Sequence, residues 1–180
     1  SNLYAVIDIN MESLGQTINV VFGSRNYQIP NSGFEDFHNA GKADEPNHWH
    51  SFQSATGDLA SMVTGNIHLT KSTDVRPGTS GKTSVKLVPV NVFVAMANGT
   101  MTTGRMVAGS ISAKDTENHA EADISNRDKD ANGDPFYTLM DGRPDAVKVW
   151  AKTKVKSGNA TISAVITDGT YYQDPEDKTY

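Results

Sequence analysis

The sequence contains no cysteine, and no apolar run in it is long enough to span a membrane. Without cysteine the chain has no thiol nucleophile, no disulfide scaffold and no zinc ribbon. A membrane-spanning helix needs about 18 or more consecutive apolar residues, so we expect no membrane insertion. A chain without cysteine fits an intracellular setting as well as a bacterial periplasm. The compartment therefore stays open at this point.

Positively charged residues are few and scattered. The chain has 16 Lys and Arg against 21 Asp and Glu, which gives a net charge of −5. The one weak basic cluster is formed by Lys148, Lys152, Lys154 and Lys156. Nucleic-acid binding needs clustered basic side chains to neutralise phosphates, so we expect no nucleic-acid partner. An anionic surface also argues against docking on anionic lipid.

Short β-strands separated by turn residues make up most of the chain. A length of 180 residues fits one domain, or one domain with a piece of another. Alternating and β-branched runs between Gly, Pro and Asn predict an all-β sandwich or barrel. No helix is needed, and the one helix candidate, over 58–62, is only five residues long. A further strand is expected to carry Trp49 and Phe52. The other strands beyond residue 30 are expected at 34–37, 62–69, 84–89, 90–95, 100–111, 119–124, 146–155 and 161–168.

The first 24 residues predict a β-hairpin. Residues 3–10 alternate between apolar and polar, and TINVVF over 17–22 reads as the return strand. Residues 25–30 form a polar linker that ends in Pro30. Among later positions, Phe34, Val85 and Leu87 are expected in the core of the domain over 31–180, because Val85 and Leu87 share one strand face.

Three segments together resemble a known family. They are NSGFEDF from Asn31 with PNHW from Pro46, SGKTSVKL from Ser80, and RPDAVKVWAK from Arg143. They resemble strands of jelly-roll carbohydrate-binding modules, and still more the carbohydrate metabolism domain (PCMD) of Bacteroidetes surface proteins. The resemblance implies a jelly-roll β-sandwich over 31–180. The hairpin over 1–24 resembles the end of a calycin-like barrel, and the alternative is that it forms outer strands of the same sandwich.

The resemblance implies a noncatalytic glycan-binding module. It also implies a periplasmic or outer-surface location, in a secreted or lipid-anchored protein. The alternatives are a glycan-active hydrolase domain and a structural or protein-interaction module of a surface assembly. The family's last strands have no counterpart before residue 180. We therefore expect either a fragment or an open sheet edge that a neighbouring domain or second chain covers.

Calcium is the cofactor that two acidic features suggest. In the jelly rolls that the GFE segment resembles, the Glu at the position of Glu35 helps to hold a structural Ca2+. DKDANGD matches the first half of an EF-hand loop, although Leu139 stands where that loop has its bidentate Glu. The same run is typical of a plain hairpin turn. The loop's candidate ligands are Asp128, Asp130, Asn132 and Asp134.

His48 and His50 are a second candidate metal pair. Two residues apart on a strand, they would share one face, and a third ligand would come from His38, His68 or His119. The alternative is a pair of solvent-facing histidines.

Exposed aromatic rings are the expected sugar-binding groups, because the C–H faces of sugars stack on flat rings. Within the set of Trp49, Phe52, Tyr137, Trp150, Tyr171 and Tyr172, the surface candidates are Trp150, Tyr171 and Tyr172. Trp49 is a further candidate, with a core role as its alternative. No catalytic residue is predicted, because no spacing singles out a carboxylate pair and no nucleophile motif occurs.

Overall fold

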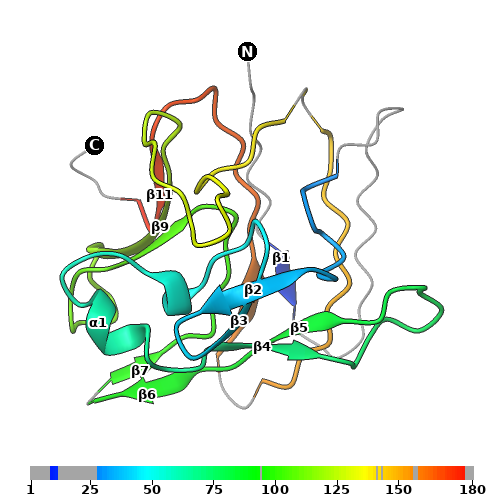
Figure 1. Ribbon diagram of the computed structural model, residues 1–180, viewed down its shortest axis with the longest axis horizontal. Helices are drawn as coiled ribbons and strands as arrows, with labels where there is room; N and C mark the ends of the chain where they lie inside the picture. Colours follow the sequence, from blue (N-terminus) through cyan, green and yellow to red (C-terminus); the bar gives the residue numbers. More distant parts are fainter. Residues whose placement is uncertain are drawn as a thin grey trace. The chain divides into compact units, whose positions relative to one another are not determined.

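The computed structural model describes residues 9–11, 28–93, 95–140, 142, 144–155 and 158–176 (Figure 1). The chain divides into two compact units. The first contains residues 1–28 and 139–170, and the second contains residues 29–138 and 171–180. The described regular structure is almost entirely short antiparallel β-strands, so the fold class is all-β, as the turn-rich sequence predicts. Within the described ranges, no helix is long and apolar enough to cross a membrane.

The first unit contains one described strand pair. Strand β1 (Ile9–Met11) runs antiparallel to β10 (Ala160–Ile162), with Asn10 opposite Thr161. The rest of the predicted N-terminal hairpin lies outside the described residues. The predicted long strand over 146–155 is wrong, because those residues are irregular apart from an isolated bridge at Val149. Alternation of β-branched residues makes a strand possible, but a strand exists only where a second chain segment completes its backbone hydrogen bonds.

The second unit contains one three-stranded sheet. Its order is β11 (Tyr172–Asp174), β9 (Asn118–Ala122) and β8 (Arg105–Ala108), all antiparallel. Strand β9 is therefore central, and residues 56–59 cover the outer edge of β8. In that edge contact Thr56 N donates to Met106 O at 2.9 Å. The covered edge leaves fewer backbone groups of β8 open to another chain.

Three hairpins complete the second unit. The glycine between β2 and β3 is required for the turn: Gly41 has φ of +60°, and a Cβ there would lie 2.3 Å from Thr64 O. This hairpin therefore lies directly against the segment that follows α1. The hairpins are β2 (Phe37–Ala40) with β3 (Ala43–Pro46), β4 (Leu69–Ser72) with β5 (Ser84–Leu87), and β6 (Val90–Val92) with β7 (Ala95–Ala97).

Several predicted strand positions are wrong in this unit. The strand expected at 34–37 is displaced, since β2 begins only at Phe37 and pairs with β3 at Ala43–Pro46. The expected strand through Phe52 is a short 3-10 helix, η1 (Phe52–Ser54), because the Ser51 hydroxyl accepts a hydrogen bond from Gln53 N and starts a turn. The expected strand over 62–69 is replaced by a one-turn helix, α1 (Ala60–Val63), followed by β4.

The core of the second unit lies between η1, α1 and β8. Its buried members are Ala55, Val63, Met106 and Ala108, and Phe52, Leu59, Val92 and Ala120 pack against them. Leu87 is not a core residue, since it is 39% exposed near the end of β5. Phe34 is partly buried and meets Trp49 edge to face, with ring centroids 5.2 Å apart. The expectation for Leu87 is wrong because alternation only assigns residues to the two faces of a strand. It does not indicate which of the two faces another element will cover.

Candidate functional site

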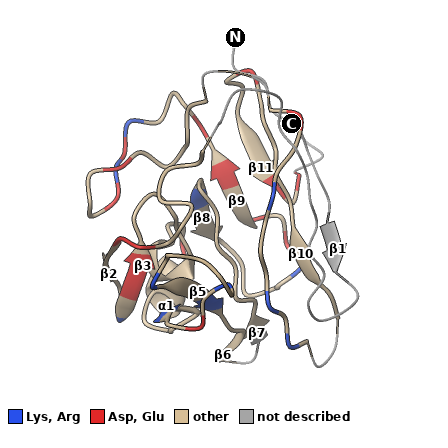
Figure 2. Ribbon diagram, turned by 90° about the vertical axis from the view of Figure 1, so that its right-hand side faces the viewer, with Lys and Arg blue, Asp and Glu red and all other residues tan. Residues whose placement is uncertain are grey.

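The most polar feature of the central sheet is a charged pair across β8 and β9. Arg105 and Glu121 are direct partners in the antiparallel register, and Arg105 Nε lies 3.7 Å from Glu121 Oε1. Figure 2 shows the corresponding blue and red segments on the two neighbouring strands. Tyr171 Oη donates to Glu121 Oε2 at 3.1 Å, and His119 Nε2 lies 3.5 Å from the same oxygen. Glu121 is therefore held from several sides.

The guanidinium of Arg105 contacts a carboxylate and an aromatic ring of the same unit. Its Nη2 donates to Asp128 Oδ2 at 2.9 Å. The guanidinium carbon Cζ lies over the ring of Phe136, 4.5 Å from the centroid. The ring of His50 lies 4.5 Å from that same Phe136 ring. Phe136 thus lies against both His50 and Arg105, and arginine on an aromatic ring is a favourable cation–π geometry.

These groups line a narrow crevice in the second unit. Its side chains lie close together and leave no room for a water molecule between them. The space is small, so a ligand would lie along the crevice and would not be enclosed by it. The lining residues are Arg105, Glu121, Asp123, Asn126, Asp128, Phe136 and Tyr137.

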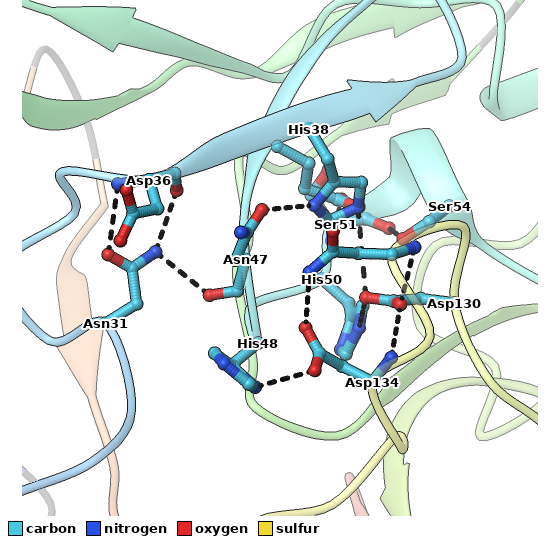
Figure 3. A network of polar contacts seen from close by, with 12 residues as sticks. Asn31, Asp36, His38, Asn47, His48, His50, Ser51, Ser54, Asp130 and Asp134 are labelled. Atoms are coloured by element: carbon cyan, nitrogen blue, oxygen red, sulfur yellow. Dashed lines mark hydrogen bonds and ion pairs between the residues drawn. The ribbon is translucent and has the colours of Figure 1, made fainter.

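The acidic loop after β9 is anchored by three histidines (Figure 3). His50 Nε2 lies 3.1 Å from Asp130 Oδ2, and His38 Nε2 lies 3.8 Å from the same oxygen. His48 Nδ1 lies 3.3 Å from Asp134 Oδ1. The structure therefore joins two features that the sequence presented separately, the histidine pair and the DKDANGD loop.

The two ring nitrogens of His50 contact different partners. Its Nδ1 lies 2.7 Å from Gly104 O, and a carbonyl oxygen only accepts, so Nδ1 carries a proton. Its Nε2 faces the Asp130 carboxylate. Burial raises the pKa of Asp130, but the Asp134 N–H and the His50 contact outweigh burial, and the net pKa is lowered. The Asp130 carboxylate therefore faces the buried His50 ring at hydrogen-bonding distance.

The acidic loop itself folds as a tight turn. Asp130 Oδ1 accepts from Asn132 N at 2.9 Å and from Asp134 N at 2.8 Å. Lys129 and Pro135 form an antiparallel bridge that closes the turn. In the described part of the chain, no three His, Asp or Glu side chains are arranged to hold a metal ion. The calcium site stays a prediction.

Glu35, the other predicted calcium ligand, binds backbone groups. Its Oε1 accepts from Lys82 N at 2.8 Å and from Thr83 N at 3.3 Å. The Lys82 N–H is the main cause of the lowered pKa of Glu35. This contact brings the GFE segment and the SGKTS segment together, although 47 residues separate Glu35 from Lys82.

The predicted sugar-binding aromatics do not gather at one place within a single unit. Trp49 is partly buried, and its Nε1 donates to Pro30 O at 3.2 Å. Tyr171 and Tyr172 belong to the second unit, where Tyr171 reaches the crevice through Glu121. Trp150 belongs to the first unit and is 51% exposed. None of the four lines the crevice, whose rings are Phe136 and Tyr137.

Two ionisable groups are buried elsewhere in the second unit. Glu45 has no exposed surface, and burial raises the pKa of its carboxyl against opposing contacts with Ser51 and Ser54. His68 is equally buried, and burial lowers its pKa. Gln53 lies beside His68, because its Oε1 accepts from the backbone N–H groups of His68 and Leu69 at 3.1 and 2.8 Å. Both ionisable groups belong to the structural interior and not to the crevice.

No protein-family model, curated protein or solved structure matches this chain. The resemblance to PCMD therefore depends on the short motifs alone.

Sequence reasoning missed Arg105, Glu121 and Phe136 as site residues. Arg105 and Glu121 did carry a signal, since each is a charged residue inside a short run that otherwise reads as strand. Their meeting depends on the β8–β9 register, which neither run reveals. Phe136 gave no signal that distinguishes it from an ordinary core aromatic.

Proposed function

We propose that the protein is a noncatalytic glycan-binding module and that the crevice of the second unit is its binding site. The observation that carries the proposal is the composition of the crevice. Two aromatic rings, an amide and several carboxylates share one narrow surface depression. This combination suits a sugar, which presents an apolar C–H face to a ring and hydroxyl groups to polar side chains.

The crevice is preorganised by the contacts around it. Arg105 fixes Asp128, and the ring of Phe136 contacts both Arg105 and His50. The loop that contributes Asp128 and Phe136 is anchored through Asp130. A binding site that is ordered before the ligand arrives loses less conformational entropy on binding. Such ordering supports a recognition role for this loop.

Binding is favoured over hydrolysis by the state of the acidic groups. A glycosidase acid needs a raised pKa at a ligand-accessible position. Among the residues that the structure describes, the carboxyl group with a clearly raised pKa is that of Glu45, which is fully buried and does not line the crevice. Within the crevice, the Ser125 hydroxyl is the main cause of the lowered pKa of Asp123. The jelly-roll architecture, the PCMD relationship and the surface location belong to this same proposal.

The test is a glycan array with the purified chain, run in Ca2+ and again in EDTA. We expect one glycan class to bind, and we expect Tyr137→Ala and Asn126→Ala to reduce its affinity about tenfold or more. Phe93→Ala is the matched control, because Phe93 is an exposed aromatic residue of the same unit that does not line the crevice. Loss of binding in EDTA would support the calcium site. Absence of binding to every glycan in both buffers would refute the module.

A second candidate function is protein interaction at the β6–β7 hairpin. Phe93, at the tip of this hairpin, is 78% exposed, and Met96 on β7 is also exposed. Large exposed apolar side chains on neighbouring positions are typical of interaction sites. If the array is negative, self-association measured by sedimentation of the native chain and of Phe93→Ala tests this reading. A shared monomeric state in both would count against it.

A further inference from the structure

We infer that an extended peptide with an acidic side chain binds in a cleft beside the β6–β7 hairpin, as an added strand at the edge of β6. The inference rests on the second candidate function and names the chemistry of the partner. It follows from the position of the cleft, from its single charge and from the exposed ring of Phe93.

The cleft has a volume of about 330 Å³ and lies within the second unit. Unlike the crevice around Arg105, it has room for ligand atoms. It is lined by the β2–β3 turn, by α1 with the residues after it, and by the β6–β7 hairpin. The lining residues are Lys42, Met62, Gly65, Asn66, Asn91, Val92 and Phe93.

The cleft runs along one edge of β6. Neighbouring residues of a strand point to opposite faces of its sheet. Asn91 and Val92 are neighbours on β6 and both line the cleft, so the cleft lies beside the strand and not over one face. Among the described strands β6 pairs with β7 alone, and none of the described lining residues belongs to β7. The cleft therefore follows the edge of β6 that no described strand pairs, where a peptide can add main-chain hydrogen bonds.

Lys42 determines the charge of the peptide. It is exposed, and it is the one charged residue among the described residues that line the cleft. The ion pairs of the described residues do not include it. Its Nζ lies 3.9 Å from the place that a Cβ would take at Gly65, so the missing side chain there leaves room for the ammonium group. A peptide carboxylate can therefore bind Lys42 without displacing a protein carboxylate.

The other side chains of the cleft also suit a peptide. Asn66 Nδ2 donates to Met62 O at 2.8 Å, which leaves the amide oxygen of Asn66 as an acceptor. The amide of Asn91 has a donor and an acceptor, as a peptide group has. Phe93 is 78% exposed and has φ of +53°, a conformation that is rare for a bulky residue and is found more often at functional sites. An apolar side chain of the peptide would cover this ring.

The test selects peptides from a phage-displayed library of random nonapeptides with the purified full chain. We expect the enriched sequences to share an Asp or Glu close to a large apolar residue. In fluorescence polarisation with an enriched peptide, Lys42→Glu should weaken binding about tenfold or more without changing the unfolding midpoint. Lys114→Glu is the matched control, because Lys114 is an exposed lysine in another turn of the same unit and does not line the cleft.

N-methylation of the enriched peptide tests the added strand. Alternate N–H groups of a strand point to the same side. Methyl groups on one alternate set of peptide nitrogens should therefore abolish binding, and methyl groups on the other set should leave most of it. Equal effects of the two sets would overturn strand addition.

The remaining outcomes separate the inference from the function on which it rests. Equal affinity of the native chain and Lys42→Glu would overturn the acidic preference while leaving an interaction at the hairpin in place. A library without enriched peptides would overturn the peptide partner. If the native chain then self-associates through Phe93, the occupant of the cleft is a second copy, and the second candidate function stands alone. A monomeric native chain without enriched peptides would overturn both.

Discussion

The imidazole of His50 and the carboxylate of Asp130 face each other at 3.1 Å, with both side chains almost completely removed from solvent. Eighty residues separate them in the chain. Their contact fixes the acidic loop against the segment that bridges to Thr102, where His50 N donates to Thr102 O at 2.7 Å. The pair is therefore a structural anchor for the loop that also contributes residues to the crevice.

Removing one partner of this buried pair should be strongly destabilising. We expect His50→Ala to lower the free energy of unfolding by roughly 3–5 kcal/mol, because it leaves a buried carboxylate without its partner. His48→Ala is the control. It removes the more exposed contact to Asp134 and should cost less than about 1 kcal/mol.

Urea unfolding of both variants measures the difference. The double variant His50→Ala with Asp130→Asn should be less damaged than the sum of its single variants, because the unpaired charge is gone. Equal costs for His48→Ala and His50→Ala would show that the His50–Asp130 pair contributes no special stability.

Glu45 should make the protein less stable as the pH rises. Its folded pKa is raised by burial, so its contribution to stability is fully present below the unfolded value of about 4.3 and is lost as pH rises through the folded value. Glu45→Gln keeps the neutral form at every pH. As pH increases from about 4, we expect the free energy of unfolding of Glu45→Gln to rise relative to that of the native chain.

Glu35→Gln is the control with the opposite sign. The folded pKa of Glu35 is lowered, so its contribution is present above its unfolded pKa and is lost as pH falls. Urea midpoints between about pH 3 and 7 should therefore diverge in opposite directions for the two variants. Parallel curves would contradict the buried position of Glu45.

The core assignment predicts unequal costs for two large apolar residues. Met106 is a buried member of the core, whereas Leu87 is 39% exposed. We expect Met106→Ala to cost about 2–5 kcal/mol through lost burial and a residual cavity. Leu87→Ala should cost about 1 kcal/mol or less, in proportion to the smaller area it buries. A larger loss of melting temperature for Leu87→Ala would place the core on the other side of β5.

Two glycines with similar backbone angles should respond differently to alanine. Gly41 and Gly78 have φ of +60° and +75°, so alanine is conformationally strained at both, by about 1–2 kcal/mol. At Gly41 the added Cβ would also meet Thr64 O at 2.3 Å, whereas nothing lies within 4 Å at Gly78. Thermal unfolding should therefore show a clearly larger loss for Gly41→Ala. Equal losses would mean that the β2–β3 turn does not contact residue 64.

Part of the candidate site could be read from the sequence. The DKDANGD run predicts a tight turn, and the turn forms, because Asp130 and Asn132 supply local hydrogen bonds that depend on few distant groups. The sequence also indicates the histidine pair, but it does not indicate the partners of the two rings. His48 and His50 lie near Asp134 and Asp130 because the fold brings together two segments that are far apart in the chain. Neither segment's own sequence indicates that the other will lie beside it.

The sequence by itself determined that the chain has no thiol chemistry and that its regular structure is mostly β-strand. Cysteine content and the positions of turn residues are properties of the sequence, so they do not depend on how the strands are arranged. The tertiary structure decided the β8–β9 register that pairs Arg105 with Glu121, the burial of Met106 in place of Leu87, and the loss of the strand expected over 146–155. Each of these depends on which segment supplies the opposing backbone or covers a given face, and those partners lie far away in the chain.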